Sequence, residues 1–530
     1  MRLGIDFGTT RIIVAHADRG NYPLVNFEGP AQQIRDWFPP LVAAREGQRL
    51  YGWDAWEAQA ESGWTVVRSL KRWLQEAGPE TAVHLGGQVV RFHQLLSELT
   101  VALRAHLQSR SSLHPAPGEA LQVMLGIPAN ANTNQRYLTA DAFRAAGFDV
   151  LGLLNEPSAA SIEFGYRNPP DGKSGRRECL LVYDFGGGTF DASLVAIDDH
   201  THSVVASAGV ATMGGDDLDE ILADLALEAS GLSEADRENL TQAEYFRLHE
   251  ECREKKETLN PNTRRVAIDL DRVREGWPEV SIPVALFYDR CRPLLEETRQ
   301  VSQDLLETHP EYSIDTLYVT GGGSELPVVA RLLRETFGRK VRRSAYMRSA
   351  TAIGLAIHAD ARAGYVLKDR FTQNFGVWRE GAGGHQVVFD LLFPRGTELP
   401  RHGEEPLCRE RTYRPVHNVG HFRYLECTQL SESGQPAGDT TEWDEIRFPF
   451  DRTLQGTANL ATLEVQRGDC VAAHTVKEIY TCDASGTIAV TICDISANYS
   501  RQYKLGRWSA KESEVTPGRP TRRRHGHRGP

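Results

Sequence analysis

The 530-residue sequence lacks any run of about 20 apolar residues, the length that a membrane-spanning helix requires. At residues 1–8 it also lacks the basic start, apolar stretch and small-residue cleavage site of a secretory signal. Hydrophobic residues make up 40% of the chain and charged residues 25%, which is ordinary for a soluble globular protein. We therefore expect a cytoplasmic protein that does not enter a membrane.

Cysteine and positive charge are scarce as well. The eight cysteines form no CxxC pair, so neither a zinc ribbon nor a disulfide framework is indicated, and we expect free thiols. A formal net charge of −11 argues against a protein that binds nucleic acid with its whole surface. The basic, Pro- and Gly-rich segment 516–530 is predicted to be a disordered tail, with a weak contact to nucleic acid or another anionic partner as the alternative.

The sequence has no GxxxxGK[ST] motif, which argues against the P-loop class of nucleotide-binding proteins. Instead, two segments resemble each other. Starting at Leu3 and at Cys179, each has an apolar run, then Asp-Phe-Gly, small residues and Thr, and a second apolar run. This pattern is typical of a β-hairpin whose turn carries glycine and hydroxyl groups. The pair predicts a duplicated domain with a phosphate-binding turn in each half.

Helical and strand-like patterns alternate through the first two thirds of the chain. Apolar periodicity predicts helices over 92–107 and 134–146, on either side of a buried strand at 121–128. A polar helix is expected over 244–259. Residues 315–337 are predicted to form a strand, a glycine turn and a helix, an arrangement that offers backbone N–H groups to a phosphate. This alternation predicts an α/β fold.

The pattern changes near Ala363, where short alternating segments with turn signals replace helical periodicity. We predict an α/β domain over 1–362, a linker over 363–370, a mostly β domain over 371–503 and a disordered basic tail over 504–530.

The two turns carry the groups that phosphoryl transfer from ATP requires. Gly8 lets the backbone approach a phosphate, while Thr9 and Thr10 supply N–H and hydroxyl donors. The second turn offers the same chemistry with Gly186, Gly187, Gly188 and Thr189. Asp6 and Asp184, at the mouths of the turns, are suited to hold magnesium through its water shell. One Asp-Phe-Gly could be an ordinary strand-to-turn junction, but two at matching positions predict a nucleotide site.

Five segments occur in order: DFGTT at Asp6, NEPSAA at Asn155, DFGGGTFD at Asp184, MGGDDLD at Met213 and GGGSELP at Gly321. In order and spacing they resemble the signatures of the heat shock protein 70 nucleotide-binding domain, over about residues 1–360. Two further segments, from Leu391 and Asp483, are similar to strand signatures of that family's peptide-binding β-sandwich.

The resemblance implies an actin-like α/β ATPase, built from two ribonuclease-H-like halves and followed by a β-sandwich-like substrate-binding domain. It implies an ATP-dependent chaperone of protein folding and stress response, which hydrolyses ATP slowly to ADP and phosphate with Mg2+, and with K+ as a further candidate ion. The implied partners are unfolded polypeptides, a J-domain co-chaperone and a nucleotide-exchange factor. Because residues 495–530 are polar and basic, we expect a member without the family's helical lid, of a bacterial type.

The resemblance also assigns roles to single residues. The implied catalytic residues are Lys71, beside the γ-phosphate, Glu156, which positions the attacking water, Asp184 and Thr189. The implied nucleotide-binding residues are Asp6, Gly8, Thr9, Thr10, Gly186, Gly187, Gly188, Asp191, Gly214, Gly215, Lys256, Gly321 and Gly322. Asp6 and Asp184 are the implied magnesium residues, acting through water. Without the ordered motifs, a lone lysine would be a solvated side chain and Glu-Pro only a turn.

Pro128 and Arg136 have the spacing of a family pair that carries the nucleotide state toward the second domain; a strand terminator is the alternative for the proline. Three positions depart from the family pattern. Arg253 and Glu257 stand where an acid and a base are usual, and Glu325 replaces an arginine that stacks on adenine. Losing that stacking predicts about tenfold weaker adenine binding, unless another group compensates.

An alternative function uses the same architecture. The chain could be a nucleotide-switched assembly or regulatory protein that binds one dedicated protein partner, with weak or no ATP hydrolysis. Residues 365–371, which correspond to the family's linker, have its length but only part of its apolar character, so the sequence supports coupling between the two domains only weakly. Architecture alone does not separate the two functions.

Overall fold

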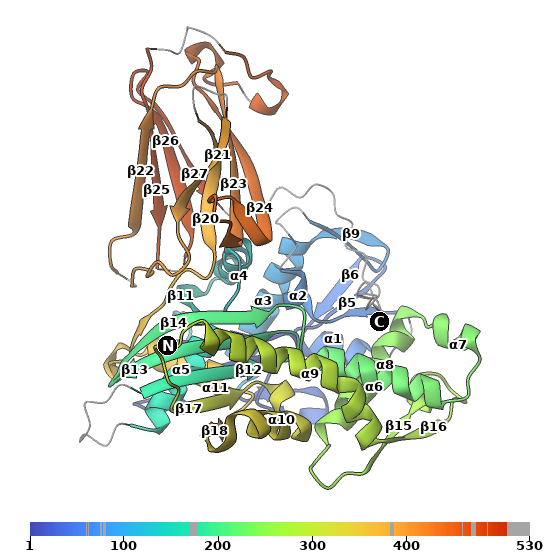
Figure 1. Cartoon of the computed structure of the whole chain (residues 1–530). Helices are drawn as coiled ribbons and strands as arrows, with labels where there is room; N and C mark the ends of the chain where they lie inside the picture. The colour runs from blue at the N-terminus through green and yellow to red at the C-terminus, as the bar shows by residue number, and fades with distance from the viewer. Residues whose placement is uncertain are drawn as a thin grey trace, which may run out of the picture.

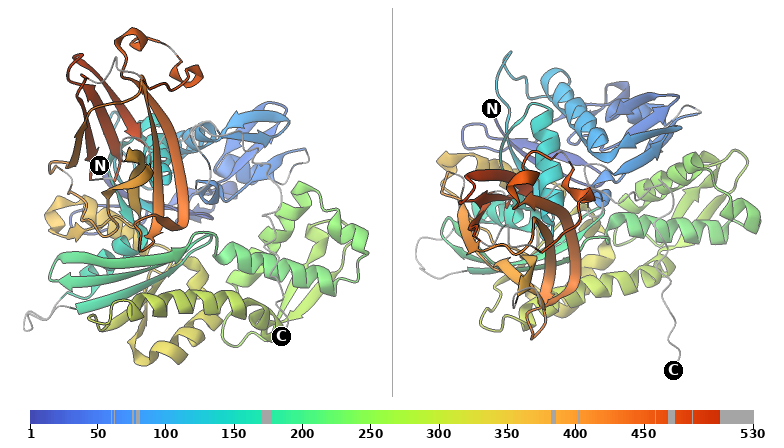
Figure 2. Two further views of the ribbon diagram at one scale, coloured as in Figure 1. Left: turned by 45° about the horizontal axis from the view of Figure 1, so that its top comes forward. Right: turned by 90° about the horizontal axis from the view of Figure 1, so that it is seen from above.

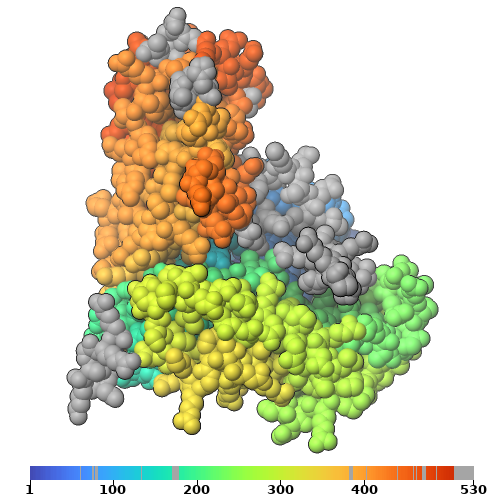
Figure 3. All heavy atoms as spheres, in the orientation of Figure 1, coloured from blue at the N-terminus to red at the C-terminus, as the bar shows by residue number. Residues whose placement is uncertain are grey.

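The computed structural model describes residues 1–505 except 60, 62, 75–76, 78–80, 170–177, 382–385, 402, 458, 468–472 and 485. A large α/β part carries a mostly β part, which projects from one side of it (Figures 1 and 3). Residues 506–530 of the expected basic tail lie outside the described residues. In the described part of the chain, no helix is long and apolar enough to cross a membrane.

The first sheet has the strand order β11-β10-β1-β2. Its strands are β1 (Arg2–Phe7), β2 (Ile12–His16), β10 (Gln122–Ile127) and β11 (Asp149–Asn155). β1 and β2 form the predicted antiparallel hairpin, and β10 and β11 lie parallel beside β1. Both faces of this sheet are covered, which explains why β1 and β10 are apolar almost throughout.

The second sheet repeats this plan with the order β18-β17-β12-β13-β14-β19. Its strands are β12 (Glu178–Phe185), β13 (Phe190–Asp198), β14 (Thr201–Val210), β17 (Thr316–Thr320), β18 (Val341–Arg343) and β19 (Val366–Lys368). β12 and β13 form the second predicted hairpin, and β17 and β18 lie parallel beside β12, as β10 and β11 do beside β1. Both predicted hairpins are therefore confirmed, each at the centre of its own sheet.

Two helices lie between the sheets: α5 (Glu156–Arg167) packs on the second sheet, and α11 (Ala350–Ala359) packs on the first. A Cβ atom on Gly354 of α11 would collide with the carbonyl oxygen of Ala159 in α5, and one on Gly4 would collide with the backbone of α11. The absence of a side chain at these two positions allows the close packing that fixes one half of the α/β part against the other.

Helices also cover the outer faces. They are α3 (Phe92–Ser109) and α4 (Thr133–Ala145) on the first sheet, and α9 (Val284–Glu307) and α10 (Pro327–Phe337) on the second. α3, α4 and α10 agree with the helices predicted from periodicity. α4 starts with a capping box at Asn132 and is followed by Gly147 with a φ of +85°, the left-handed conformation that ends a helix.

Each half carries an insert, and the two inserts lie next to each other on one side of the molecule (Figure 2). The first contains β3 (Phe27–Glu28), β4 (Ile34–Arg35), β5 (Val42–Arg45), β6 (Gln48–Tyr51), α1 (Trp53–Ala58), β7 (Thr65–Val67), α2 (Leu70–Trp73), β8 (Ala82–Leu85) and β9 (Gln88–Arg91). The second contains α6 (Gly215–Ala229), α7 (Glu234–Glu238), α8 (Gln242–Glu257), β15 (Arg265–Asp269) and β16 (Glu279–Pro283). Phe246 of α8 joins a buried cluster with Leu41, Trp64 and Val66 of the first insert, so the inserts share apolar contact.

The β-rich C-terminal part consists of two antiparallel sheets, with orders β21-β20-β23-β24 and β22-β25-β26-β27. Their strands are β20 (Asn374–Gly381), β21 (Gln386–Phe393), β22 (Leu407–Tyr413), β23 (Val419–Leu430), β24 (Pro436–Pro449), β25 (Val476–Cys482), β26 (Ile488–Asp494) and β27 (Tyr499–Leu505). Both sheets contribute to one core, which includes Phe375, Tyr424, Phe448, Val490 and Ile492. This arrangement is that of a β-sandwich.

A buried polar cluster interrupts this core. The Arg379 guanidinium donates to Glu478 Oε2 at 2.6 Å and to Asp390 Oδ2 at 2.6 Å. Arg411 donates to the second oxygen of Asp390 at 2.8 Å, and the Tyr413 hydroxyl donates to Glu478 at 2.5 Å. The side chain of Glu478 is fully buried. These bonds join β20 and β21 of one sheet to β22 and β25 of the other.

The cluster yields a stability prediction. Replacing Arg379 with Met leaves the buried Glu478 charge without its main partner, so we expect a loss of about 3–5 kcal/mol in the free energy of unfolding. The double variant Arg379→Met/Glu478→Leu should recover most of this loss. Lys477→Met, which breaks a more exposed pair between Lys477 of β25 and Glu410 of β22, is the matched control and should cost less than about 1 kcal/mol. Urea denaturation measures the free energy of unfolding of each variant. Equal losses for Arg379→Met and Lys477→Met would contradict the expectation.

Candidate nucleotide site

A cleft lies where the two central hairpins and the two inserts meet. It is lined by Asp6, Gly8, Thr9, Thr10, Lys71, Glu156, Asp184, Gly186, Gly187, Thr189, Gly215, Lys256, Gly321 and Gly322. The structure therefore brings together all the candidate residues except Gly188, Asp191 and Gly214, which lie just behind the lining.

The two hairpin turns face each other across the cleft with little space between them. A Cβ atom on Gly187 would lie 2.9 Å from the side chain of Thr10, and one on Gly188 would collide with Oγ1 of Thr9. Glycine at both positions leaves room for a phosphate chain beside the turns and exposes backbone N–H groups. The residues present therefore fit a polyphosphate.

The start of α6 supports the second turn. The Gly215 N–H donates to the carbonyl oxygen of Gly186 at 2.9 Å, and the Asp216 N–H donates to that of Gly187 at 2.7 Å. The Gly214 N–H donates to the Asp217 carboxylate at 2.7 Å. In this structure the N–H groups of Gly214 and Gly215 thus hold neighbouring protein groups, and their contact with nucleotide stays a prediction.

Lys71 and Glu156 form a buried ion pair at the centre of the cleft. Lys71 comes from α2 of the first insert, while Glu156 is the first residue of α5, directly after β11. Burial alone would lower the pKa of Lys71, but the charges of Glu156 and Asp6 outweigh it and raise the pKa, so the ammonium stays charged. An ammonium has three N–H donors, so one bond to Glu156 leaves two for phosphate oxygens.

Carboxylates outnumber cations around this pair. Burial, reinforced by repulsion from Glu156, raises the pKa of Asp6 to about 7 and that of Asp191 to about 7, although Lys71 acts in the opposite direction. The same causes raise the pKa of Asp184 well above its usual value. The Ala129 N–H donates to Asp191 at 3.0 Å and fixes its orientation.

This excess of carboxylate oxygens suits a hard divalent cation. In the described part of the chain, no group of three His, Cys, Asp or Glu side chains could hold a metal ion by itself. Magnesium usually keeps several waters and takes phosphate oxygens as further ligands, so Asp6 and Asp184 could contact it through its water shell.

The other end of the cleft contains an alternating chain of arginines and carboxylates. Arg348 pairs with Glu325 and, at 3.1 Å, with Glu257, while Glu257 pairs with Arg11 at 2.7 Å. Burial opposes ionisation of Glu257, but Arg11 and Arg348 prevail and lower its pKa to about 2. Arg348 lines the cleft and puts a guanidinium near the position where Glu325 replaces the expected arginine.

Lys256 and Gly321 complete this end. Lys256 pairs with the buried Asp219 at 2.7 Å and donates to the carbonyl oxygen of Gly215 at 2.5 Å. Gly321 has a φ of +85°, and a Cβ there would collide with the carbonyl oxygen of Phe185. The strand, glycine turn and helix predicted for 315–337 are confirmed as β17, a 3-10 turn at Gly322–Glu325 and α10.

Sequence reasoning missed several charged residues of the cleft and its rim, among them Arg11, Arg72, Asp219 and Arg348. Arg11 follows the first turn directly, Arg72 follows Lys71, and Asp219 lies in the MGGDDLD segment, so each had a local signal. Arg348 had none, because only the fold brings it next to Glu325.

The site continues toward the β part through Asn155, which precedes Glu156. Its side-chain amide donates to both oxygens of Asp369, at 2.9 and 3.0 Å, and its carbonyl oxygen accepts from Arg136 at 3.0 Å. Asp369 lies in the expected linker, directly after β19, which pairs with β14 of the second sheet. Gln373 and Arg395 add bonds from the β part to Asn130 and Ser207.

Two repeated sheets around a cleft with two facing glycine turns define a two-lobed α/β protein whose cleft suits a nucleotide. The family model described as "Hsp70 protein" matches residues 107–375. This chain belongs to the heat shock protein 70 family.

Named relatives agree with this assignment. The chain is 30% identical over 418 residues to "Chaperone protein DnaK" of Thermotoga neapolitana, covering 75% of this chain and 66% of that protein. It is 28% identical over 426 residues to "Chaperone protein HscA homolog" of Colwellia psychrerythraea, with 75% and 64% covered. It is 28% identical over 409 residues to "Chaperone protein DnaK" of Metamycoplasma hominis, with 75% and 65% covered. The chain thus spans just under two thirds of the length of these curated relatives.

The facing turns make a testable prediction. Gly188→Ala adds a methyl group that collides with Thr9, a stiff β-branched side chain, so the turns must move apart. We expect ATP affinity to fall about tenfold, roughly 1.4 kcal/mol. Gly186→Ala adds the same methyl group, but its nearest neighbour is 3.5 Å away, so its effect should be clearly smaller. Titration with a fluorescent ATP analogue measures the affinities of both variants. Equal affinities would contradict phosphate binding between the two facing turns.

Proposed function

We propose that this chain is an ATP-dependent molecular chaperone of the heat shock protein 70 type. An actin-like ATPase domain over 1–362 binds and slowly hydrolyses ATP, and a β-sandwich domain over 371–503, joined by the linker 363–370, binds unfolded polypeptide. The observation that carries the proposal is the continuous contact from the Lys71–Glu156 pair through Asn155 to Asp369 of the linker.

In the proposed mechanism, Thr9 and Thr10 of one turn and the N–H groups of the other orient the phosphate chain from both sides. Lys71 stabilises the negative charge that develops during transfer, because its ammonium is buried, charged and near the turns. Glu156 accepts a hydrogen bond from the attacking water and so orients it. Bound magnesium would neutralise part of the phosphate charge, through waters held by Asp6 and Asp184.

The coupling follows from the chain itself. Glu156 begins α5, and Asn155 is the residue before it, so a shift of the carboxylate toward water or phosphate also moves the partner of Asp369. Arg136 is buried between Asn155 and the β part, next to Gly486 and close to Glu426. A nucleotide-dependent change at Glu156 therefore has a short path to the linker and the sandwich.

The remaining expectations stay predictions: a J-domain co-chaperone and a nucleotide-exchange factor as partners, and a cytoplasmic location.

Steady-state ATP hydrolysis, with and without an unfolded peptide, tests this function. We expect slow hydrolysis that peptide accelerates and that Lys71→Ala removes. Asp369→Asn should keep basal hydrolysis but lose most of the acceleration, since the amide weakens the contact with Asn155. Asp289→Asn, at an exposed position of α9, is the matched control and should behave like the unchanged protein.

Each other result has a clear meaning. No hydrolysis by the unchanged protein would contradict the proposed activity. Hydrolysis that peptide does not affect would contradict the coupling and favour a β domain dedicated to another partner.

A further inference from the structure

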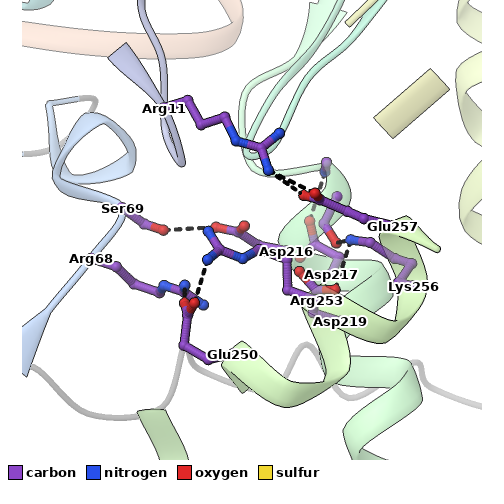
Figure 4. A network of polar contacts seen from close by, with 12 residues as sticks. Arg11, Arg68, Ser69, Asp216, Asp217, Asp219, Glu250, Arg253, Lys256 and Glu257 are labelled. Atoms are coloured by element: carbon purple, nitrogen blue, oxygen red, sulfur yellow. Dashed lines mark hydrogen bonds and ion pairs between the residues drawn. The ribbon is translucent and has the colours of Figure 1, made fainter. Parts of the chain in front are cut away.

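The side chains on both sides of Lys71 reach across the cleft to the other half of the protein. Arg68 and Ser69 precede Lys71 on the first insert, and Arg72 follows it. Figure 4 shows Arg68 and Ser69 pointing from the first insert toward Glu250 of α8 and Asp216 of α6. The polar side chains next to Lys71 therefore bond to the opposite half.

Two of these contacts end on the first turn of α6. The Ser69 hydroxyl donates to Asp216 Oδ2 at 2.7 Å, and Arg72 Nη2 donates to Asp217 Oδ2 at 2.5 Å. Arg72 Nε also donates to the carbonyl oxygen of Gly188 at 3.2 Å. We name these three bonds, made by Ser69 and Arg72 to Asp216, Asp217 and Gly188, the α2–α6 clasp.

The clasp holds the same groups that shape the second phosphate turn. The Gly215 and Asp216 N–H groups bond the carbonyls of Gly186 and Gly187, so the start of α6 and this turn form one unit. A displacement of the turn relative to the first half must pull on Arg72 and Ser69, and with them on α2.

The backbone next to Lys71 depends on such contacts. Ser69 has φ 60° and ψ 32°, a left-handed conformation that is unfavourable for a residue with a side chain. The hydrogen bond from the Ser69 hydroxyl to the charged carboxylate of Asp216 stabilises Ser69 in this conformation. Without this hydrogen bond, the backbone at the start of α2 can return to a more favourable conformation, and this change would displace Lys71.

A second layer of contacts supports the clasp from behind. Glu250 pairs with both Arg68 and Arg253, and Arg68 lies over the ring of Phe246 at 5.0 Å. Arg253 lies over Trp56 of the first insert at 5.7 Å. α8 thus keeps the first insert close to α6 without touching Lys71.

We propose that Arg72 and Ser69 are positioning residues: the α2–α6 clasp places Lys71 in the cleft only while the two halves are closed. The catalytic part of this inference rests on the proposed ATP hydrolysis. Opening of the halves breaks the bonds to Asp216, Asp217 and Gly188 and withdraws the ammonium from Glu156. Because of the clasp, the two halves must close before the phosphoryl group can be transferred.

The first test needs no nucleotide and follows the reactivity of Lys71. The variants are Arg72→Gln, Ser69→Ala and Asp217→Asn, which keeps an acceptor for the Gly214 N–H and so preserves the start of α6. Each is treated with acetic anhydride, and mass spectrometry measures acetylation of Lys71, with the buried Lys256 as internal reference. We expect acetylation of Lys71 to rise several-fold and that of Lys256 to stay unchanged.

The second test follows hydrolysis. The same variants should lower kcat about tenfold with KM changed by less than about threefold, because the interaction acts in the transition state. The double variant Arg72→Gln/Asp217→Asn should be no worse than Arg72→Gln alone, since Arg72→Gln already removes the bond to Asp217. Glu228→Gln, which breaks an exposed pair between α6 and Arg290, is the matched control and should leave both readouts unchanged.

The outcomes separate this inference from the proposed function. Unchanged acetylation of Lys71 in variants with an unchanged melting temperature would overturn the clasp, whether or not the protein hydrolyses ATP. Raised acetylation with unchanged kcat, or a rise in KM alone, would overturn its role in positioning for catalysis. Absence of hydrolysis by the unchanged protein would refute the proposed function, while the acetylation result would still decide the clasp.

Discussion

The close approach of two glycine turns, each at the centre of its own sheet, is the constraint on which the rest of the molecule depends. The turns can face each other only if the two sheets are held at a fixed separation, and glycines at Gly4 and Gly354 provide it by letting α11 pack tightly against β1 and α5. They also need partners that keep them in place, which the start of α6 supplies for the second turn.

Charge in the cleft follows from this geometry. Burial and repulsion from Glu156 raise the pKa values of Asp6, Asp184 and Asp191, although Lys71 lowers them, so the site favours a cation together with phosphate. Lys71 comes from an insert rather than from either sheet, and therefore depends on contacts across the cleft. Glu156, in contrast, does not come from an insert. It begins α5, and its neighbour Asn155 connects it to the linker. In the proposed mechanism, closure of the two halves acts on Lys71 and the β part acts on Glu156, the two members of one ion pair.

The sequence predicted the parts of this arrangement that are local. Both hairpins, α3, α4 and α10 and the β-rich C-terminal part followed from periodicity, glycine turns and caps, because these signals lie within a few residues. The pairing of Arg348 with Glu325 and Glu257 could not be predicted, since only the fold brings these residues together. The polar cluster around Glu478 could not be predicted either. The alternation along β25 predicts which residues point inward, but it does not predict that one of them is a buried charge paired with a residue on another strand. The domain boundaries and the roles of the site residues stay predictions.

Amide hydrogen–deuterium exchange of the full chain, with and without ATP and magnesium, tests most directly whether both halves hold one nucleotide. The account predicts that addition of MgATP slows exchange in both turns together, at residues 7–10 and 186–189. Protection of one turn alone, or of neither, would contradict a site built from two facing hairpins.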